Sequence, residues 1–203
     1  MANPKKGHEI PTIDVSLVTI KTSGSETEIA LNTASQIAVT VQTETTDATK
    51  LVVKGVLIAQ KPQQTTITGN TIVLTDNVFN PEVVKILQGG TIKYWTSADQ
   101  TETTDTDAGF GVASYAPPVA GSSEKGKIFT LNAYSAIYNA AGLITGYEKI
   151  SYPNCQGTPI ALNSQDNVFR APEYTINSAP NTGEAPYTID YVKTLPAVDP
   201  VHA

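Results

Sequence analysis

Reactive and metal-binding side chains are scarce in this sequence. Its 203 residues include one cysteine and two histidines. Cys155 has no second cysteine for an intrachain disulfide, and a zinc site would need further ligands that the chain does not supply. His8 and His202 lie close to the two ends, where preorganised pockets are rare. Because acid–base and triad catalysis usually depend on a histidine, these absences argue against an enzyme.

Carboxylates offer two weaker routes to chemistry. Glu148 and Glu173 could form the pair that a glycosidase needs, but no sequence feature brings them together. The acidic stretch with Glu102, Asp105 and Asp107 lacks the regular ligand spacing of a calcium-binding loop, so we interpret it as a solvated loop. We therefore expect no catalytic residue, no cofactor and no bound metal.

Positive charge and long apolar runs are also lacking. Arg170 is the only arginine, the lysines are scattered and the formal net charge is −6. Tight binding to nucleic acid needs clustered basic residues, so an acidic chain of this kind suits a surface along which DNA slides without sticking. No apolar run approaches the roughly 20 residues of a membrane span, and no signal peptide follows the N-terminal lysines. We expect synthesis in a cytoplasm and no membrane insertion.

The residues that are abundant predict β-strands. Threonine, valine and isoleucine recur throughout, and charged residues make up only 16% of the chain. Apolar and polar residues alternate at 13–17 and again at 35–43, as in a sheet with one dry face. In the second segment Ile37, Val39 and Val41 share one face, and the small uncharged side chains of Gln36, Ala38, Thr40 and Gln42 share the other.

Several further segments have recognisable patterns. Residues 44–48 are interpreted as a polar loop, residues 50–59 as a strand buried on both faces, and residues 65–75 as a hairpin that turns at Gly69 and Asn70. A long acidic loop is predicted from 96 to 109. Other strands are predicted at 91–95, 110–115, 127–138, 144–152, 168–176 and 187–192.

One short helix is predicted at about residues 80–88. Asn80 can cap its N-terminus, Pro81 suits the first helical position, and Gly89 with Gly90 ends it. The fold class is therefore mainly β, a sandwich or barrel with one flanking α-helix. We expect a single domain over residues 10–195, with flexible arms at 1–9 and 196–203.

A short internal echo links two parts of the chain. The residues DNVF occur at 76–79 and again at 166–169, each followed within a few residues by Pro-Glu. No repeat extends beyond this motif, so coincidence is the simpler interpretation and a duplicated half is the alternative.

Two regions carry a resemblance to a known family. They are residues 50–90, KLVVKGVLIAQKPQQTTITGNTIVLTDNVFNPEVVKILQGG, and the segments GYEKISYPNCQG, DNVFRAPEYTINSAP and GEAPYTIDYV between 146 and 192. In order and spacing these resemble the major tail tube proteins of bacteriophages and phage-like particles of Gram-positive hosts. The resemblance spans residues from about 50 to 195.

The resemblance implies a structural protein of the virion tail, assembled in the host cytoplasm. Subunits of that family form hexameric rings that stack into a hollow tube for genome ejection through the host envelope. The implied partners are further copies of the chain, the tape measure, the tail terminator, the baseplate and, in contractile tails, a sheath. DNA would pass through the lumen without tight binding.

Candidate positions follow from this implied architecture. The uncharged face with Gln36, Thr40 and Gln42 is the candidate lumen surface. Loops at 43–48 and 97–108 are the candidates for contacts between subunits, and acids in the first loop are an alternative lumen feature. The charged residues concerned are Glu44, Asp47, Asp99, Glu102, Asp105 and Asp107.

Two other functions remain open at this stage. An immunoglobulin-like or carbohydrate-binding surface module would share the strands and the acidic charge, but it would be a stable monomer. An enzyme would need a base that the sequence supplies only near its ends. The sequence also leaves open whether a tube would belong to a contractile tail, a long flexible tail or a bacteriocin-like particle.

Overall fold

The computed structural model describes residues 10–25, 28–96, 101–104 and 111–198. It is mainly β, with one short helix among the described residues, as the sequence predicts. Three segments lie outside the described ranges. They are the N-terminal segment 1–9 that was expected to be flexible, most of the predicted loop at 96–109, and the last five residues.

One large antiparallel sheet forms the body. Its strand order is β2-β1-β10-β11-β12-β6-β3, and β13 pairs separately with β11. The strands are β1 (Thr12–Thr22), β2 (Glu28–Leu31), β3 (Ala34–Thr46), β6 (Gln64–Asp76), β10 (Phe129–Tyr138), β11 (Ile144–Gly157), β12 (Glu173–Ser178) and β13 (Thr188–Val192).

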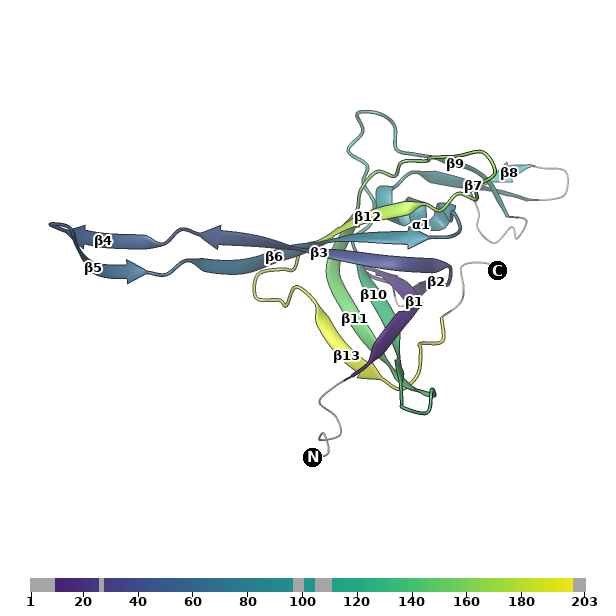
Figure 1. Ribbon diagram of the computed structural model, residues 1–203. Helices are drawn as coiled ribbons and strands as arrows, with labels where there is room; N and C mark the ends of the chain where they lie inside the picture. Colours follow the sequence, from purple (N-terminus) through teal and green to yellow (C-terminus); the bar gives the residue numbers. More distant parts are fainter. Residues whose placement is uncertain (1–9, 26–27, 97–100, 105–110, 199–203) are drawn as a thin grey trace.

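The sheet bends into two layers at the middle of β11. Residues 147–151 of this strand pair with β13, whereas residues 155–157 pair with β12. Between them Asn154 adopts a left-handed conformation (φ 48°), and the register with β10 shifts beside it, between Phe129 and Leu131. Such bulges bend a strand, so β1, β10, β11 and β13 form one layer and β12, β6 and β3 the other (Figure 1).

The core lies between these layers. Strand β1 supplies Val18 and Ile20, and the opposite layer supplies Ile72 and Leu74, all four completely buried. Alternation along β6 places these apolar residues inside and threonines outside. The tyrosines Tyr152 and Tyr174 and the aromatic ring of Phe129 complete the same cluster.

The helix α1 (Pro81–Gln88) closes one end of the core. The side chain of Asn80 accepts hydrogen bonds from the backbone N–H groups of Glu82 and Val83, and Gly89 follows the last turn with φ 86°. The predicted start, end and caps of the helix are thus confirmed. Its buried residues are Val83, Val84, Ile86 and Leu87.

A small sheet packs beside this helix. It contains β7 (Thr91–Trp95), β8 (Glu102–Thr103) and β9 (Val112–Ala116) in the order β8-β7-β9. The Gln88 amide donates to the Tyr115 hydroxyl (2.8 Å), and that hydroxyl donates to the carbonyl of Gly89 (2.8 Å). These bonds attach the small sheet to the C-terminus of α1.

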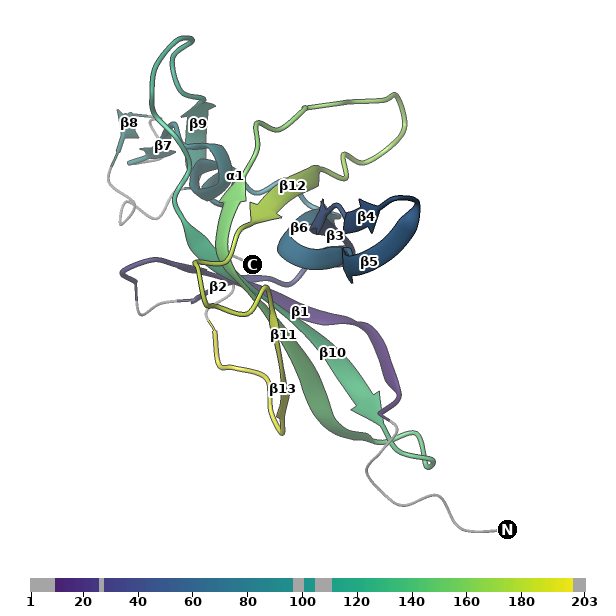
Figure 2. The same ribbon diagram turned by 90° about the vertical axis from the view of Figure 1, so that its left-hand side faces the viewer.

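The most prominent feature is a long two-stranded arm. Strands β3 and β6 run on past the body, and a separate pair, β4 (Thr49–Val53) and β5 (Val56–Lys61), continues in the same direction (Figures 1 and 2). We call residues 43–67 the arm and residues 49–61 its tip. The two pairs are separated by Asp47 and Ala48 on one strand and by Pro62 and Gln63 on the other, where proline cannot donate to the ladder.

The arm corrects three sequence predictions. Glu44, Thr45 and Thr46 belong to β3 and are not part of a loop. Residues 50–59 are not one buried strand, because they turn at Lys54 and Gly55 and are exposed throughout. Residues 65–75 are not a hairpin but part of one continuous strand, β6.

Gly69 serves close packing instead of a turn. A β-carbon at this position would lie 2.5 Å from the carbonyl oxygen of Ser178 on β12. The turn residues of the real hairpin are Lys54 (φ 50°) and Gly55 (φ 81°), whose two positive φ angles are those of a type I′ turn.

We predict that Gly69→Ala destabilises the body. The added methyl group forces β6 and β12 apart, and overpacking of this kind costs about 1–3 kcal/mol of unfolding free energy. Gly55→Ala is the matched control, because its backbone strain is confined to the tip and should leave the melting of the body unchanged. Urea unfolding followed by circular dichroism measures both, and equal stability of Gly69→Ala and wild type would contradict the packing argument.

Candidate assembly surfaces

The predicted polar face lies on the outside of the layer formed by β3, β6 and β12. Cross-strand register places Gln36, Thr75 and Glu173 in one row and Thr40, Thr71 and Asn177 in another. All alternate with the core-facing residues of the same strands. The sequence-predicted candidates Gln36, Thr40 and Gln42 therefore share one exposed surface.

A chain of side-chain hydrogen bonds crosses this surface. The Gln42 amide donates to the Thr71 hydroxyl (2.7 Å), which donates to the amide oxygen of Asn177 (3.2 Å). The face consists mainly of uncharged hydroxyls and amides, with Ala38 and Val73 in the row between and Glu173 at one margin. Such a face can hold water beside a neighbouring anionic polymer, and it lacks the clustered positive charges that would bind the polymer tightly.

The outer edge of β3 is open. Strand β3 ends the sheet and pairs with β6 on one side alone. Strand β1 comes close to it in the body, but no described strand forms a ladder with the outer backbone N–H and C=O groups of β3. The edge has no lysine and no proline, and Glu44 is its only charged residue. On its core-facing side Val39 and Val41 are 38% and 45% exposed. Natural proteins usually guard such an edge or use it for pairing.

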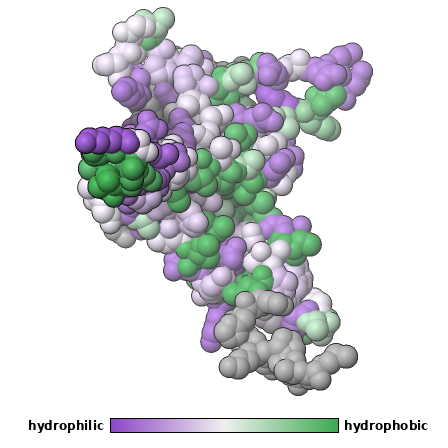
Figure 3. All heavy atoms as spheres, turned by 60° about the vertical axis from the view of Figure 1, so that its left-hand side comes forward, coloured by the Kyte–Doolittle hydropathy of each residue, from purple (hydrophilic) through white to green (hydrophobic). Residues whose placement is uncertain are grey.

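The tip is apolar on both faces of its ribbon. Six large aliphatic residues are between 48% and 61% exposed. Figure 3 shows these hydrophobic side chains at the end of the arm beside a row of hydrophilic ones. The six residues are Leu51, Val52, Val53, Val56, Leu57 and Ile58. A two-stranded hairpin of this kind is marginally stable alone in water, and a concentrated apolar surface usually marks an interaction site.

The candidate acidic positions are dispersed. Glu44 is exposed on the arm, Asp47 lies at the break between β3 and β4, and Glu102 forms an ion pair with Lys93 (2.8 Å). Asp99, Asp105 and Asp107 lie outside the described residues. The structure thus brings no set of these acids together within the ranges that it describes.

The echoed motifs meet in space. The guanidinium of Arg170 lies 5.7 Å from the centre of the Phe79 ring, which links the end of one DNVF segment to the residue after the other. Phe169 itself is 96% exposed, and Val78 and Val168 are also exposed. The loop between β11 and β12 therefore presents a second apolar patch, which sequence reasoning did not assign.

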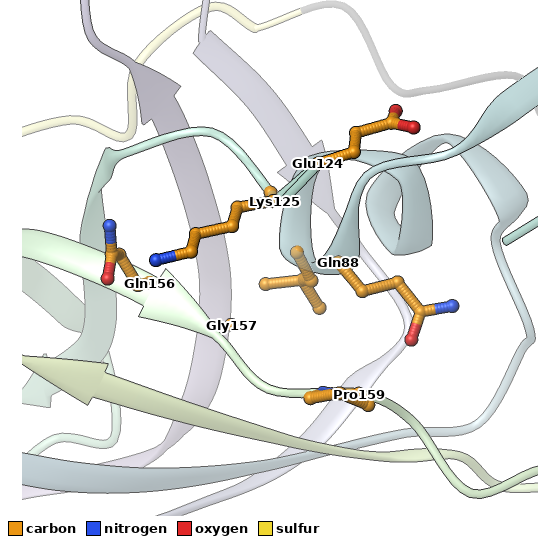
Figure 4. Close-up of a pocket in the computed structure, with 8 residues that line it drawn as sticks. Gln88, Glu124, Lys125, Gln156, Gly157 and Pro159 are labelled. Carbon is orange, nitrogen blue, oxygen red and sulfur yellow. The ribbon is translucent and has the colours of Figure 1, made fainter. Parts of the chain in front are cut away.

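The pocket at the end of α1 contains no reactive set of groups. It has a volume of about 150 Å³ and lies between the helix C-terminus, residues 124–126 and residues 156–159. Lys125 extends across it toward Gln156, while Glu124 points away (Figure 4) and accepts a hydrogen bond from the Gly90 N–H (3.0 Å). No nucleophile and base converge here.

Other potentially reactive groups are buried in the core. Burial raises the pKa of the Cys155 thiol to about 11, and its side chain has no exposed surface. Among the described residues no cluster of histidine, cysteine and acidic side chains could hold a metal ion. Within the same ranges no helix is long and apolar enough to cross a bilayer.

Comparison with known proteins gives little likeness. No family model matches the sequence, and no curated protein matches it. Among solved structures, the chain is similar to one from the baseplate of the anti-feeding prophage, at 11% identity and a TM-score of 0.32, over 94% of this chain and 93% of the other. A likeness at this level assigns neither fold nor function.

We predict that stability falls at alkaline pH. Burial, then the charge and hydrogen bond of Glu82, raise the pKa of Tyr94 to about 12, and burial raises the pKa of Tyr174 to about 12. An unfolded tyrosine ionises near 10, so the unfolded chain loses these protons first and the stability present below pH 10 declines between pH 10 and 12.

Ultraviolet titration of tyrosinate together with urea unfolding at several pH values measures this effect. Tyr94→Phe should flatten the decline in stability between pH 10 and 12. A constant unfolding free energy over that interval would contradict the assignment.

Proposed function

We propose that this chain is a structural subunit of a phage or phage-like tail, in which copies join side by side into rings that stack as a tube. The observation that carries the proposal is the open edge of β3. No catalytic role is proposed, because the described residues bring together no nucleophile, base and binding cavity.

The edge of β3 favours pairing with another copy. Its unpaired backbone groups gain strand partners there, and Val39 and Val41 lose their contact with water at the same time. A contact between this edge and a different surface of the next copy is head-to-tail, so repetition around an axis closes a ring. The resemblance to tail tube proteins supports six copies in each ring.

The polar face suits the inside of such a ring. It lies on the same layer as the open edge, so joining copies through β3 continues this layer around the central axis. A wall of threonine, glutamine and asparagine then faces the passage, with few charges to hold DNA. Gln36, Thr40 and Gln42 are the proposed lumen residues, and Glu44 adds negative charge where the arm begins.

The arm suits contacts beyond the immediate neighbour. It projects from the body (Figure 1), and its apolar tip needs cover that its own chain does not provide. A monomeric surface module that binds carbohydrate has no comparable use for an open edge and an uncovered arm. We therefore place the protein in a tail tube, where it would meet tape measure, terminator and baseplate proteins.

We predict that Val39→Lys with Val41→Lys stops polymerisation and leaves the subunit folded. Both side chains are already partly exposed, so two ammonium groups cost the monomer little but would be buried at the joint. Ser123→Lys, in an exposed loop far along the chain, is the control for added charge. Negative-stain electron microscopy and sedimentation velocity measure assembly.

The expected result is hollow filaments for wild type and Ser123→Lys and monomers for the double variant. Wild-type protein that remains monomeric at high concentration would overturn the proposed function and favour the surface module. Filaments formed equally well by the double variant would remove β3 from the joint.

A further inference from the structure

We propose that the tip of the arm of one copy docks on strand β13 of a second copy. This inference rests on the proposed self-assembly and names the surface that receives the arm. The tip and the strand match in three properties: both expose apolar side chains, they carry opposite charges, and both have unpaired backbone edges.

The tip must be covered on more than one side. In the register of β4 and β5, Val53 lies opposite Val56 and Val52 lies opposite Leu57. Neighbouring residues of a strand point to opposite faces, so these two pairs place aliphatic side chains on both faces of the ribbon. A single flat contact would leave one face in water, so a site between or along other strands fits the tip better.

The tip carries a charge opposite to the rest of the chain. Lys50, Lys54 and Lys61 lie within it, and it contains no acidic residue. The remaining residues hold 10 lysines and arginines against 19 acids, a formal charge of −9. None of the three lysines forms an ion pair within the part of the chain that the structure describes. The acidic remainder of another copy therefore attracts the tip.

Strand β13 has the properties of a receiving surface. Tyr187, Ile189 and Tyr191 alternate along one face and are 39%, 46% and 57% exposed. Glu148 lies opposite Tyr191 in the register and so shares this face. The strand pairs with β11 on one side, and its other edge meets no described strand. Aliphatic tip residues can pack on this strip while a lysine meets Glu148 or a tyrosine ring.

The strip is held in place before any partner arrives. The ring of Tyr187 lies 6.2 Å from that of the buried Tyr152, centroid to centroid. The amide of the fully buried Asn70 donates to the carbonyl of Pro186 (2.9 Å), which fixes the chain just before β13. A preorganised surface loses little entropy on binding.

A second copy fits these observations better than other partners. In Figure 1 the tip projects away from the body and from its own β13, so one chain cannot make the contact with itself. Another exposed apolar patch, at Val168 and Phe169, has the cation of Arg170 beside it, which repels lysine. Among the paired residues of β11 and β13, Glu148 is the charged residue on the receiving face, since Lys149 and Asp190 lie on the opposite face, and the exposed Lys193 follows directly after the strand.

Cross-linking between two single-site variants tests the contact directly. One protein carries Val56→Cys in the tip and the other carries Ile189→Cys in β13; both positions are exposed, whereas the native Cys155 is buried and unreactive. They are mixed under polymerising conditions, oxidised mildly and digested for mass spectrometry. We expect a disulfide between positions 56 and 189, at least about tenfold more abundant than in the control, because docking raises the local thiol concentration.

The control pairs Val56→Cys with Val119→Cys, whose position is 78% exposed in a different loop. Equal cross-linking in the two mixtures would mean random collision and would overturn the proposal. No cross-link at position 189 in filaments that form normally would also overturn it, while the proposed function would stand. Wild-type protein that forms no filaments would refute the proposed function itself.

Charge exchange provides a second, independent readout. Lys50→Glu with Lys54→Glu should slow filament growth and remove its dependence on salt, and Glu148→Lys in the same chain should restore part of the rate. Growth unchanged by the reversal would contradict the electrostatic part. Phosphatidylserine vesicles test a lipid surface as the alternative partner of the tip. If the wild-type chain binds the vesicles, the Lys50→Glu, Lys54→Glu variant does not, and no 56–189 cross-link forms, the tip binds lipid and the proposal is overturned.

Discussion

The structure depends on the requirement that the backbone hydrogen bonds of a strand find partners. The inner strands of the main sheet have partners on both sides over part of their length. In contrast, β3 has β6 on one side alone, and among the described strands β4 and β5 of the tip pair only with each other. The body is complete in its core and incomplete at this edge. An unguarded edge and an uncovered apolar tip on the same hairpin indicate that the folded chain is made to pair further.

Polar and charged groups are also distributed differently between the body and the tip. Ile72 and Leu74 of β6 face the core with the buried polar residues Asn70 and Asp76, whereas Thr71 on the outward side joins Gln42 and Asn177 in a hydrogen-bonded surface. The lysines of the tip contrast with the acidic remainder of the chain. In the proposed assembly, the polar surface and the cationic tip serve different contacts.

The few potentially reactive side chains among the described residues have structural roles. Cys155 is enclosed by the core, where burial keeps its thiol protonated, and the pocket beside α1 holds Lys125 and amides in place of a nucleophile with its base. Side chains that might react serve packing or join elements, as Tyr115 does between Gln88 and Gly89.

Local patterns in the sequence were sufficient for the elements whose signals are local. The cap at Asn80, the proline after it and Gly89 specify α1 within a few residues, and alternation from Gln36 to Gln42 identifies the two faces of β3. The arm was missed because an apolar run such as that around Val52 reads equally well as a buried strand. The pair Lys54 and Gly55 at its centre, flanked by similar apolar residues, was the available signal for a hairpin.

Other features depended on contacts between distant residues. Gly69 looked like a turn residue, and its need for space becomes evident only where Ser178 of β12 passes beside it. Likewise, alternating tyrosine and isoleucine in β13 predicted a strand, but only the fold left their side uncovered. The sequence by itself determined the mainly β class, the helix at 81–88 and the scarcity of cysteine and histidine, since these depend on local periodicity and composition. Tertiary structure alone decided which strand edges and sheet faces remain exposed, because a strand is covered only where residues distant in the sequence pair with it or pack on it.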